Sequence, residues 1–207
     1  MEPNKRIKAG MTLVESLMAI TIFTIGIAGF SLLFTRSWRS NSFAFELGQS
    51  SMAVSQGMNE MIEYIRKARQ GDDGSYPIKS ASDNDLVIFS DYDKDGVTER
   101  LHFYKSGYQI IMGYRKPSGT LPKTYASGDE ATKVIVSGGI INNASEPIFY
   151  YYNKNYPEDQ VNNPLVAPVD VSSVRLVKFF LKINLVPNRA PDNVELRNFV
   201  ELRNLSD

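Results

Sequence analysis

A long apolar stretch near the N-terminus constrains the fold of this chain more than any other feature of the sequence. From Met11 to Phe34, a stretch of 24 residues, Glu15 is the only charged residue. A helix of that length would measure about 36 Å, enough to cross the hydrocarbon core of a bilayer. Three basic residues closely precede the stretch and two closely follow it. This slight bias favours a cytoplasmic N-terminus by the positive-inside rule.

Three interpretations account for this stretch. A secretory signal peptide has an apolar core of about 7–15 residues followed by a small-residue cleavage site, and the chain meets neither requirement. A plain signal anchor fits the length but leaves Glu15 unexplained, because an acid in a membrane costs free energy and needs a partner. Cleavage before Met11 is the third interpretation. It would create an α-amino group four residues from Glu15, which supplies that acid with a cationic partner.

The segment GMTLVE at residues 10–15 lies between a short basic leader and the apolar stretch. It resembles the type III signal of type IV pilins and type II secretion pseudopilins. The resemblance implies that a membrane-embedded prepilin peptidase cuts between Gly10 and Met11 on the cytoplasmic side. The same enzyme would then methylate the new N-terminus at Met11. The resemblance also implies that Glu15 pairs with the N-terminal amine of an adjacent subunit during assembly.

A helical pattern continues beyond the apolar stretch, and no proline interrupts the chain between Pro3 and Pro77. Apolar residues recur at helical spacing among charged ones, which predicts that one helix face packs on a domain. These apolar residues are Leu47, Val54, Met58, Met61, Ile62 and Ile65. Gly71 follows a cationic last turn and is a plausible stop signal. We therefore predict a single helix over residues 11–69.

After residue 71 the hydrophobic period changes from that of a helix to that of β-strands. The predicted strands are DLVIF, ERLHFY, YQIIMGYR, KVIVSGGI, PIFYYYN, SVRLVKFFLKINL and NVELRNFVELRNL. Turn-rich segments join the first three, which predicts an antiparallel meander. Residues 153–168 are rich in proline, asparagine and acids and are predicted to form a surface loop. The aromatic run FYYY is expected to serve sheet packing rather than ligand binding.

These elements predict an α+β fold with the pilin-like lollipop layout, in which one long N-terminal helix packs its amphipathic half on an antiparallel β-sheet head. The expected divisions are a cleaved leader at 1–10, a membrane and assembly helix at 11–34, its amphipathic continuation at 35–70 and the head at 71–207. The order of the pieces in the head resembles the J-type pseudopilins and the W-type minor pilins.

Between the first two predicted strands, the segment DYDKDG matches the first half of a D-x-D-x-D-G calcium loop. Asp91, Asp93 and Asp95 alternate so that their oxygens converge, and Glu99 occupies the ninth position. The twelfth position is His102 instead of the bidentate glutamate of an EF-hand, so a full EF-hand is excluded. Two interpretations stay open. One is a calcium site made of these four acids, and the other is a polar hairpin loop. No other cofactor is required.

Composition excludes several classes of function. The chain has no cysteine, which removes disulfides, thiol nucleophiles and cysteine-ligated metals. Lys+Arg and Asp+Glu are balanced at 23 each, so no net positive field favours a nucleic-acid partner. The single histidine, His102, lies in a strand pattern and is expected to be an ordinary strand residue. Common catalytic motifs are lacking in the sequence, so we do not expect an enzyme.

The resemblance implies a structural subunit rather than a catalyst. Such a subunit is processed by prepilin peptidase and is held in the bacterial inner membrane, with a cytoplasmic N-terminus and an extracytoplasmic head. It then joins other pilin or pseudopilin subunits in a helical filament. Its expected role is to initiate or cap a type IV pilus or a type II secretion pseudopilus. The alternative is a tip-located adhesin or binding module carried on a pilin helix.

Overall fold

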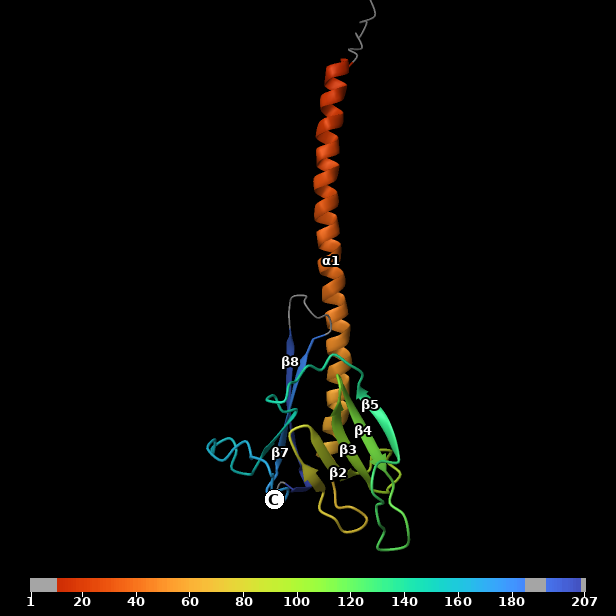
Figure 1. Cartoon of the computed structure of the whole chain (residues 1–207), viewed down its shortest axis with the longest axis vertical. Helices are drawn as coiled ribbons and strands as arrows, with labels where there is room; N and C mark the ends of the chain where they lie inside the picture. Colours follow the sequence, from red (N-terminus) through yellow and green to blue (C-terminus); the bar gives the residue numbers. More distant parts are fainter. Residues whose placement is uncertain (1–10, 185–192, 206–207) are drawn as a thin grey trace, which may run out of the picture. The chain divides into compact units, whose positions relative to one another are not determined.

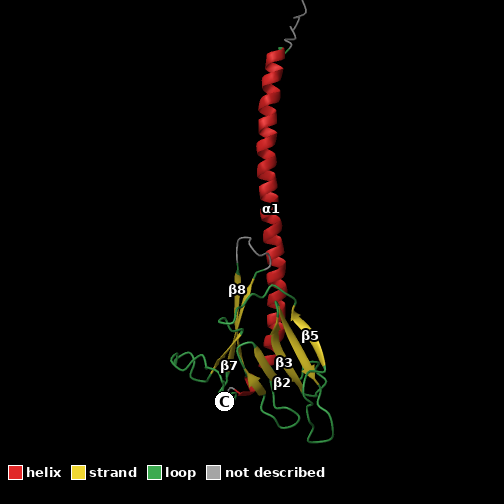
Figure 2. Ribbon diagram, in the orientation of Figure 1, coloured by secondary structure: helices red, strands yellow, loops and turns green. Residues whose placement is uncertain are grey.

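The computed structural model describes residues 11–184 and 193–205. These residues form the helix α1 (Leu13–Arg66), eight β-strands and the short 3-10 helix η1 (Arg203–Leu205). Figures 1 and 2 show these elements by position in the chain and by type. The chain divides into two compact units, Met1–Gly48 and Gln49–Asp207, and α1 contributes residues to both.

The helix begins with a reciprocal cap between Thr12 and Glu15. The backbone N–H of Thr12 donates to Glu15 Oε2 at 3.2 Å, and the backbone N–H of Glu15 donates to Thr12 Oγ1 at 3.3 Å. This is the capping-box arrangement, which satisfies two backbone donors that have no partner inside the helix. The prediction of one uninterrupted helix is confirmed, with its ends two and three residues inside the predicted ones.

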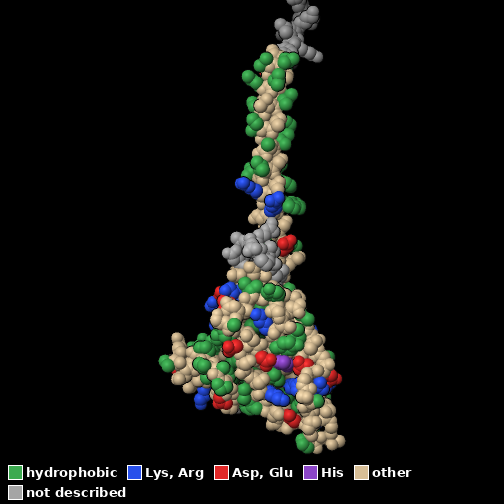
Figure 3. Space-filling view, in the orientation of Figure 1, with side chains coloured by type: hydrophobic (Ala, Val, Ile, Leu, Met, Phe, Trp, Pro, Cys, Tyr) green, Lys and Arg blue, Asp and Glu red, His purple; other side chains and the backbone are tan. Residues whose placement is uncertain are grey.

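In the first unit, α1 exposes apolar side chains, and Figure 3 shows them following one another along this part of the helix. By length and composition α1 is long and apolar enough to cross a membrane. Its hydroxyl groups suit such an environment. Thr21 donates to the carbonyl of Leu17 at 2.8 Å, and Thr24 and Thr35 make the same bond to the residue four positions before them. These side chains therefore need no water.

The second unit contains two antiparallel sheets, with strand orders β1-β2-β3-β4-β5 and β6-β7-β8. The first sheet consists of β1 (Ile78–Ala81), β2 (Asp85–Ser90), β3 (Glu99–Ser106), β4 (Gln109–Arg115) and β5 (Ala131–Val136). The second consists of β6 (Phe149–Tyr152), β7 (Leu176–Ile183) and β8 (Val194–Glu201). The predicted meander is confirmed, since β2, β3 and β4 pair in sequence order.

One hydrophobic core joins the C-terminal turns of α1 to both sheets. The helix contributes a buried face with the spacing that the sequence predicted, and each large apolar side chain buried there stabilises the fold by about 1.5–3 kcal/mol. The buried residues of this face are Val54, Met58, Met61, Ile62 and Ile65. Leu47, which was predicted to continue the face, has a side chain outside the described part of the chain.

The C-terminal residues of the described chain lie beside the C-terminal end of α1. The side chain of Asn204, in η1, donates to the backbone carbonyl of Ala68 at 2.8 Å, and the N–H of Arg69 donates to the carbonyl of Phe89 in β2 at 2.9 Å. These bonds satisfy polar backbone groups where the helix stops. The first bond fastens η1 to the end of the helix, and the second fastens the end of the helix to the first sheet.

The described strands differ from the predicted ones in two respects. The sequence pattern did not predict β1, because its four residues IKSA contain a single fully buried apolar side chain, Ile78. β5, β7 and β8 are shorter than the runs that predicted them. β5 ends at Val136 before the Ser-Gly-Gly segment, β7 begins only at Leu176, and β8 ends at Glu201, after which Arg203–Leu205 form η1. The run FYYY packs as expected, with Phe149 and Tyr151 almost fully buried.

Gly57 allows α1 to lie against β5. A Cβ atom at this position would be 2.4 Å from the backbone oxygen of Ile135 and 3.0 Å from Cγ2 of Val136. A backbone oxygen of a paired strand cannot move aside as the end of a flexible side chain can. A glycine inside a helix costs roughly 1 kcal/mol relative to alanine. We infer that the close packing of helix and strand offsets this cost.

We expect Gly57→Ala to lower the free energy of unfolding of the head by about 1–3 kcal/mol, the usual effect of overpacking a core. Gly48→Ala is the matched control, because a Cβ at that helical glycine meets nothing within 4 Å. The control should be neutral or stabilising by up to about 1 kcal/mol. Urea denaturation of the full chain in detergent micelles, followed by near-ultraviolet circular dichroism, measures both. If both substitutions changed the free energy of unfolding equally, the close contact between Gly57 and β5 would not be what requires a glycine there.

Candidate functional site

The loop between β2 and β3 gathers acidic side chains. Ser90 at the end of β2 pairs with Glu99 at the start of β3, so Asp91, which follows β2, lies beside Glu99. Asp91, Asp93 and Glu99 each offer a carboxylate oxygen, and these three oxygens all lie within 4.8 Å of one another. The structure therefore brings together three of the four acids that the sequence singled out for calcium. Asp95 is not a member of this group.

The aspartates also shape the loop itself. The N–H of Gly96 donates to Asp91 Oδ2 at 3.1 Å, and the N–H of Asp95 donates to Asp93 Oδ1 at 3.3 Å. Asp95 Oδ1 in turn accepts a 2.8 Å bond from the N–H of Val97. Gly96 has a φ of +88°, which favours glycine at this turn. The loop is thus folded by its own carboxylates.

Two cations approach these acids. Lys116, directly after β4, places Nζ 2.9 Å from Asp93 Oδ2 and 3.0 Å from Asp95 Oδ2. These two hydrogen bonds raise the pKa of Lys116. Arg69 lies with Nη2 3.6 Å from Asp91 Oδ2 and donates from the same atom to the carbonyl of Gly96 at 3.0 Å. Lys116 therefore joins Asp95 to the other acids.

Glu99 is the buried member of the cluster. Its side chain is 0% exposed, and its Oε2 accepts only a long bond of 3.4 Å from the N–H of Tyr92. Its Oε1 accepts no hydrogen bond from any described residue, and Lys116 Nζ lies 3.7 Å away. Burial, reinforced by the negative charge of Asp93, raises the pKa of Glu99 to about 7. Asp91 Oδ1 is likewise buried without a partner in the described structure.

The second polar cluster centres on His102. Its Nε2 lies 2.6 Å from Asp85 Oδ2 and its Nδ1 lies 3.0 Å from Asp129 Oδ2. Both ring nitrogens therefore face carboxylates, an arrangement that suits the doubly protonated imidazolium. Burial, the largest single effect, lowers the pKa of His102, but the hydrogen bonds with Asp85 and Asp129 outweigh it. The pKa consequently lies above its usual value of 6.5.

Neighbouring strands hold Asp129 in place. Gly113 of β4 pairs with His102, and a Cβ on Gly113 would lie 2.1 Å from Asp129 Oδ2. The absence of a side chain at Gly113 thus leaves room for Asp129 to reach the ring. Arg100 Nη2 lies 3.4 Å from Asp129 Oδ1 and fixes the other carboxylate oxygen. His102 does lie in a strand as expected, but the sequence pattern gave no sign of its two acidic partners.

The predicted processing and assembly residues lie at the start of the described chain. Gly10 is outside the described residues. Met11 is 70% exposed and directly precedes the capping box. Glu15 accepts bonds at Oε2 from the backbone N–H and the hydroxyl of Thr12, at 3.2 and 3.3 Å. The structure thus gives Glu15 a capping role that the sequence interpretation did not include, although the spacing Thr-x-x-Glu is its usual signature.

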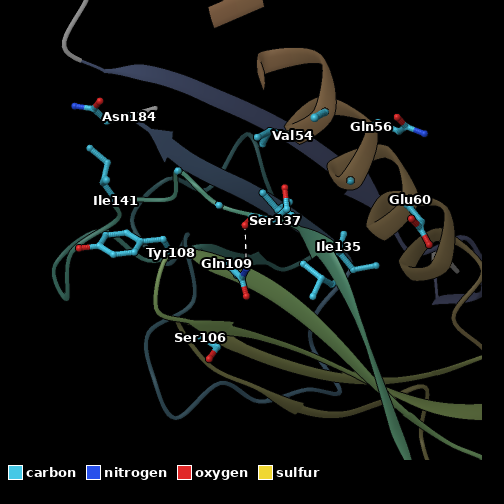
Figure 4. A pocket seen from close by; sticks show the side chains of 16 residues that line it. Val54, Gln56, Glu60, Ser106, Tyr108, Gln109, Ile135, Ser137, Ile141 and Asn184 are labelled. Atoms are coloured by element: carbon cyan, nitrogen blue, oxygen red, sulfur yellow. Dashed lines mark hydrogen bonds between the residues drawn. The ribbon is translucent and has the colours of Figure 1, made fainter. Parts of the chain in front are cut away.

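An open groove of about 1130 Å³ lies between α1 and the edge strand β5 (Figure 4). Glu60 is the only charged residue among the described residues that line it. That carboxylate already accepts bonds from Lys133 and from the hydroxyl of Tyr64. The side chain of Gln109 donates to the carbonyl of Ser137 at 2.9 Å. The charged group and one of the amides that line the groove are therefore already paired within the protein.

No protein-family model matches the chain, and no curated protein matches its sequence. A functional assignment therefore depends on the residues themselves and on the geometry given above.

We expect the stability that His102 contributes to depend on pH. Because its pKa is raised in the folded state, this stability is fully present below about pH 6.5 and is lost as pH rises through the folded pKa. His102→Gln should therefore lower the melting temperature of the full chain in micelles more at about pH 6 than at about pH 9.

Tyr104→Phe is the matched control, since it keeps an aromatic ring 4.6 Å from the imidazole and leaves His102 in place. The difference in melting temperature between Tyr104→Phe and the wild type should be the same at both pH values. A pH-independent effect of His102→Gln would show that the two carboxylates do not stabilise a charged ring.

Proposed function

We propose that this protein is a minor pilin or pseudopilin subunit, processed by prepilin peptidase and assembled into a filament through its N-terminal helix. The observation that carries the proposal is the GMTLVE segment at the start of an exposed apolar helix. A soluble protein has no use for so many exposed apolar side chains. In a simple anchor an acid in the first turn would serve only to cap the helix, and its charge would have no partner in the membrane. A subunit that packs its helix against others uses both features.

Glu15 has two possible roles in such a subunit, one local and one between subunits. Within its own chain it closes the capping box with Thr12. In a filament its carboxylate would pair with the amine that cleavage creates at Met11 of a neighbouring subunit. An unpaired acid surrounded by apolar helices costs free energy, so this pairing would penalise any wrong stagger between subunits.

The remaining parts of the proposal concern location and role. Before assembly the subunit would be held in the bacterial inner membrane by residues 11–34, with a cytoplasmic N-terminus and an extracytoplasmic head. Arg36 and Arg39 follow this stretch, and Trp38 between them is 65% exposed, a composition typical of a membrane interface. We further propose that the subunit initiates or caps a type IV pilus or type II secretion pseudopilus, together with other subunits.

Substitutions at Glu15 separate the two roles of this residue. Glutamine can close a capping box but carries no charge, so Glu15→Gln should leave the helix cap intact and still abolish most of the assembly. Glu15→Val should also impair assembly, and both variants should be cleaved. Thr12→Val keeps the carboxylate and the backbone N–H that donates to it, but removes the hydroxyl that donates to Glu15 Oε2 and accepts the N–H of Glu15. The measurement is the amount of filament, or of secreted substrate, in a strain that lacks the native gene.

Wild-type assembly by Glu15→Gln combined with poor assembly by Thr12→Val would contradict a role for the charge. That outcome would assign Glu15 to helix capping alone.

Processing at the Gly10–Met11 bond is tested by a bulky substitution before it. Glycine permits close backbone approach to a peptidase site, so Gly10→Leu should block cleavage, and the chain should keep its leader. Gly48→Leu is the control, because it introduces the same side chain far from the bond and should leave cleavage unchanged. Gel mobility and the mass of the N-terminal peptide report the result. Removal of the leader from Gly10→Leu at the wild-type rate would contradict the proposed processing.

A further inference from the structure

The acidic loop between β2 and β3 holds more negative charge than its protein partners neutralise. Four carboxylates, those of Asp91, Asp93, Asp95 and Glu99, share the contacts of two cations, Lys116 and Arg69. Lys94, in the same loop, lies with Nζ 3.7 Å from Glu63 Oε1. With Lys94 counted, one negative charge is left over when all four acids are ionised. Such an excess in one short loop favours the binding of a further cation.

The buried carboxylate of Glu99 points to where that cation would lie. Its Oε1 is buried and accepts no hydrogen bond from the described residues, although it belongs to a side chain with no exposed surface. Leaving such a group unsatisfied costs free energy. One of the two Glu99 oxygens groups with oxygens of Asp91 and Asp93, all within 4.8 Å of one another. Oε1 itself lies 3.7 Å from Lys116 Nζ, the ammonium that bonds to Asp93 and Asp95, so the unsatisfied atom faces the acidic cluster.

Lys116 places a positive charge in the acidic cluster but does not form a hydrogen bond with Glu99 Oε1. Its ammonium group forms hydrogen bonds with Asp93 and Asp95 but lies 3.7 Å from Glu99 Oε1, beyond hydrogen-bonding distance. The Lys116 side chain is 43% exposed and so is free to withdraw into solvent. A lysine in this position acts as a built-in counter-ion that a better cation can replace.

The oxygen spacing fits a calcium ion. Calcium binds oxygen ligands at 2.3–2.6 Å, so two ligands of one ion lie at most about 5 Å apart, and the spacing within the cluster is 4.8 Å or less. The donors are carboxylates, two from a loop and one from the first residue of β3, and calcium accepts such irregular geometry. Magnesium requires a near-ideal octahedron and holds its water, so it fits such a loop less well.

We propose that Asp91, Asp93 and Glu99, supported by Asp95, form a calcium site in which Lys116 competes with the ion. Calcium displaces the Lys116 ammonium and supplies the partner that Glu99 Oε1 otherwise lacks. The site lies at the junction of β2 and β3, so its occupation stabilises the start of the meander. This inference is independent of the proposed filament function, because it concerns the head alone.

The test uses the full chain in detergent micelles, first stripped of metal with EDTA. Isothermal titration with CaCl₂ should show one site, and calcium should raise the melting temperature of the head. Tb³⁺ should show luminescence sensitised by Tyr92, whose backbone N–H contacts Glu99, and calcium should quench it. No heat with millimolar calcium and no change in melting would overturn the proposal. An equal response to MgCl₂ would overturn the assignment to calcium.

Variants distinguish calcium binding at this specific site from nonspecific attraction of calcium to any acidic side chain. Asp93→Asn and Glu99→Gln should weaken calcium binding by at least about tenfold, and Asp93→Asn keeps the test valid if Glu99→Gln fails to fold. Asp159→Asn is the matched control, because Asp159 also accepts backbone N–H bonds in an exposed loop, from Val161 and Asn162. It should leave binding unchanged.

Lys116→Gln gives the decisive result. If Lys116 competes with the ion, its removal should tighten calcium binding by about tenfold, because a like charge near the ion is removed. If Lys116 only braces the loop, the same substitution should weaken binding or leave it unchanged, and either result would overturn the proposed competition.

Discussion

The burial of one face of α1 is the constraint on which the head depends. Met61 and Ile65 have no exposed surface, and they belong to the same core as the inner faces of both sheets. A three-stranded sheet such as β6–β8 is stable only when its apolar face packs on another element. The helix supplies that element for both sheets, and Gly57 sets how close it lies to β5. The head therefore needs this segment of the chain to be helical.

The alternation of side chains along β3 explains why two polar clusters lie on opposite sides of one strand. Leu101 and Phe103 face the core, and Glu99 has the same parity, so its carboxylate is buried at the point where the core ends. Arg100 and His102 face the other side. There the connection between β4 and β5 covers them, through the carbonyls of residues 126 and 128 and the carboxylate of Asp129.

That connection, residues 116–130, is held almost entirely by polar contacts. Lys123 pairs with Asp72 at 2.7 Å, and the hydroxyl of Tyr125 donates to the carbonyl of Thr98 at 2.6 Å while its ring packs on Phe89. Through Lys116 the same segment reaches the acidic loop. One irregular segment thus links both clusters. It supplies the cations that pair with Asp93, Asp95 and Asp72.

The sequence predicts the helix and strands, whose hydrophobic residues recur at regular spacing, but few of the contacts made by residues 116–130. The long helix, its buried face and the β2–β4 meander follow from spacings of 3.6 and 2 residues. The contacts of His102 join residues 17 and 27 positions apart in the sequence, and Lys116 meets Asp93 across 23 positions. Such pairs depend on strand register and on the course of a loop, which have no periodic signal. The sequence predicted the convergence of Asp91, Asp93 and Glu99, but it was wrong to include Asp95 in the same group, and it gave no sign of the contacts of Lys116.

At the other end of the chain, the cap on α1 bears on how subunits would assemble. Both bonds from Thr12 to the Glu15 carboxylate go to Oε2. A carboxylate has a second oxygen with its own lone pairs, so Oε1 can accept a further bond from an amine without breaking the cap. In the proposed filament, capping would hold the acid in one orientation at the first turn of the helix. A fixed acid selects one stagger between neighbouring helices more sharply than a mobile one, because fewer side-chain rotamers can follow a displaced amine. Thr12 would then contribute to assembly by positioning Glu15, although it need not touch the neighbouring subunit.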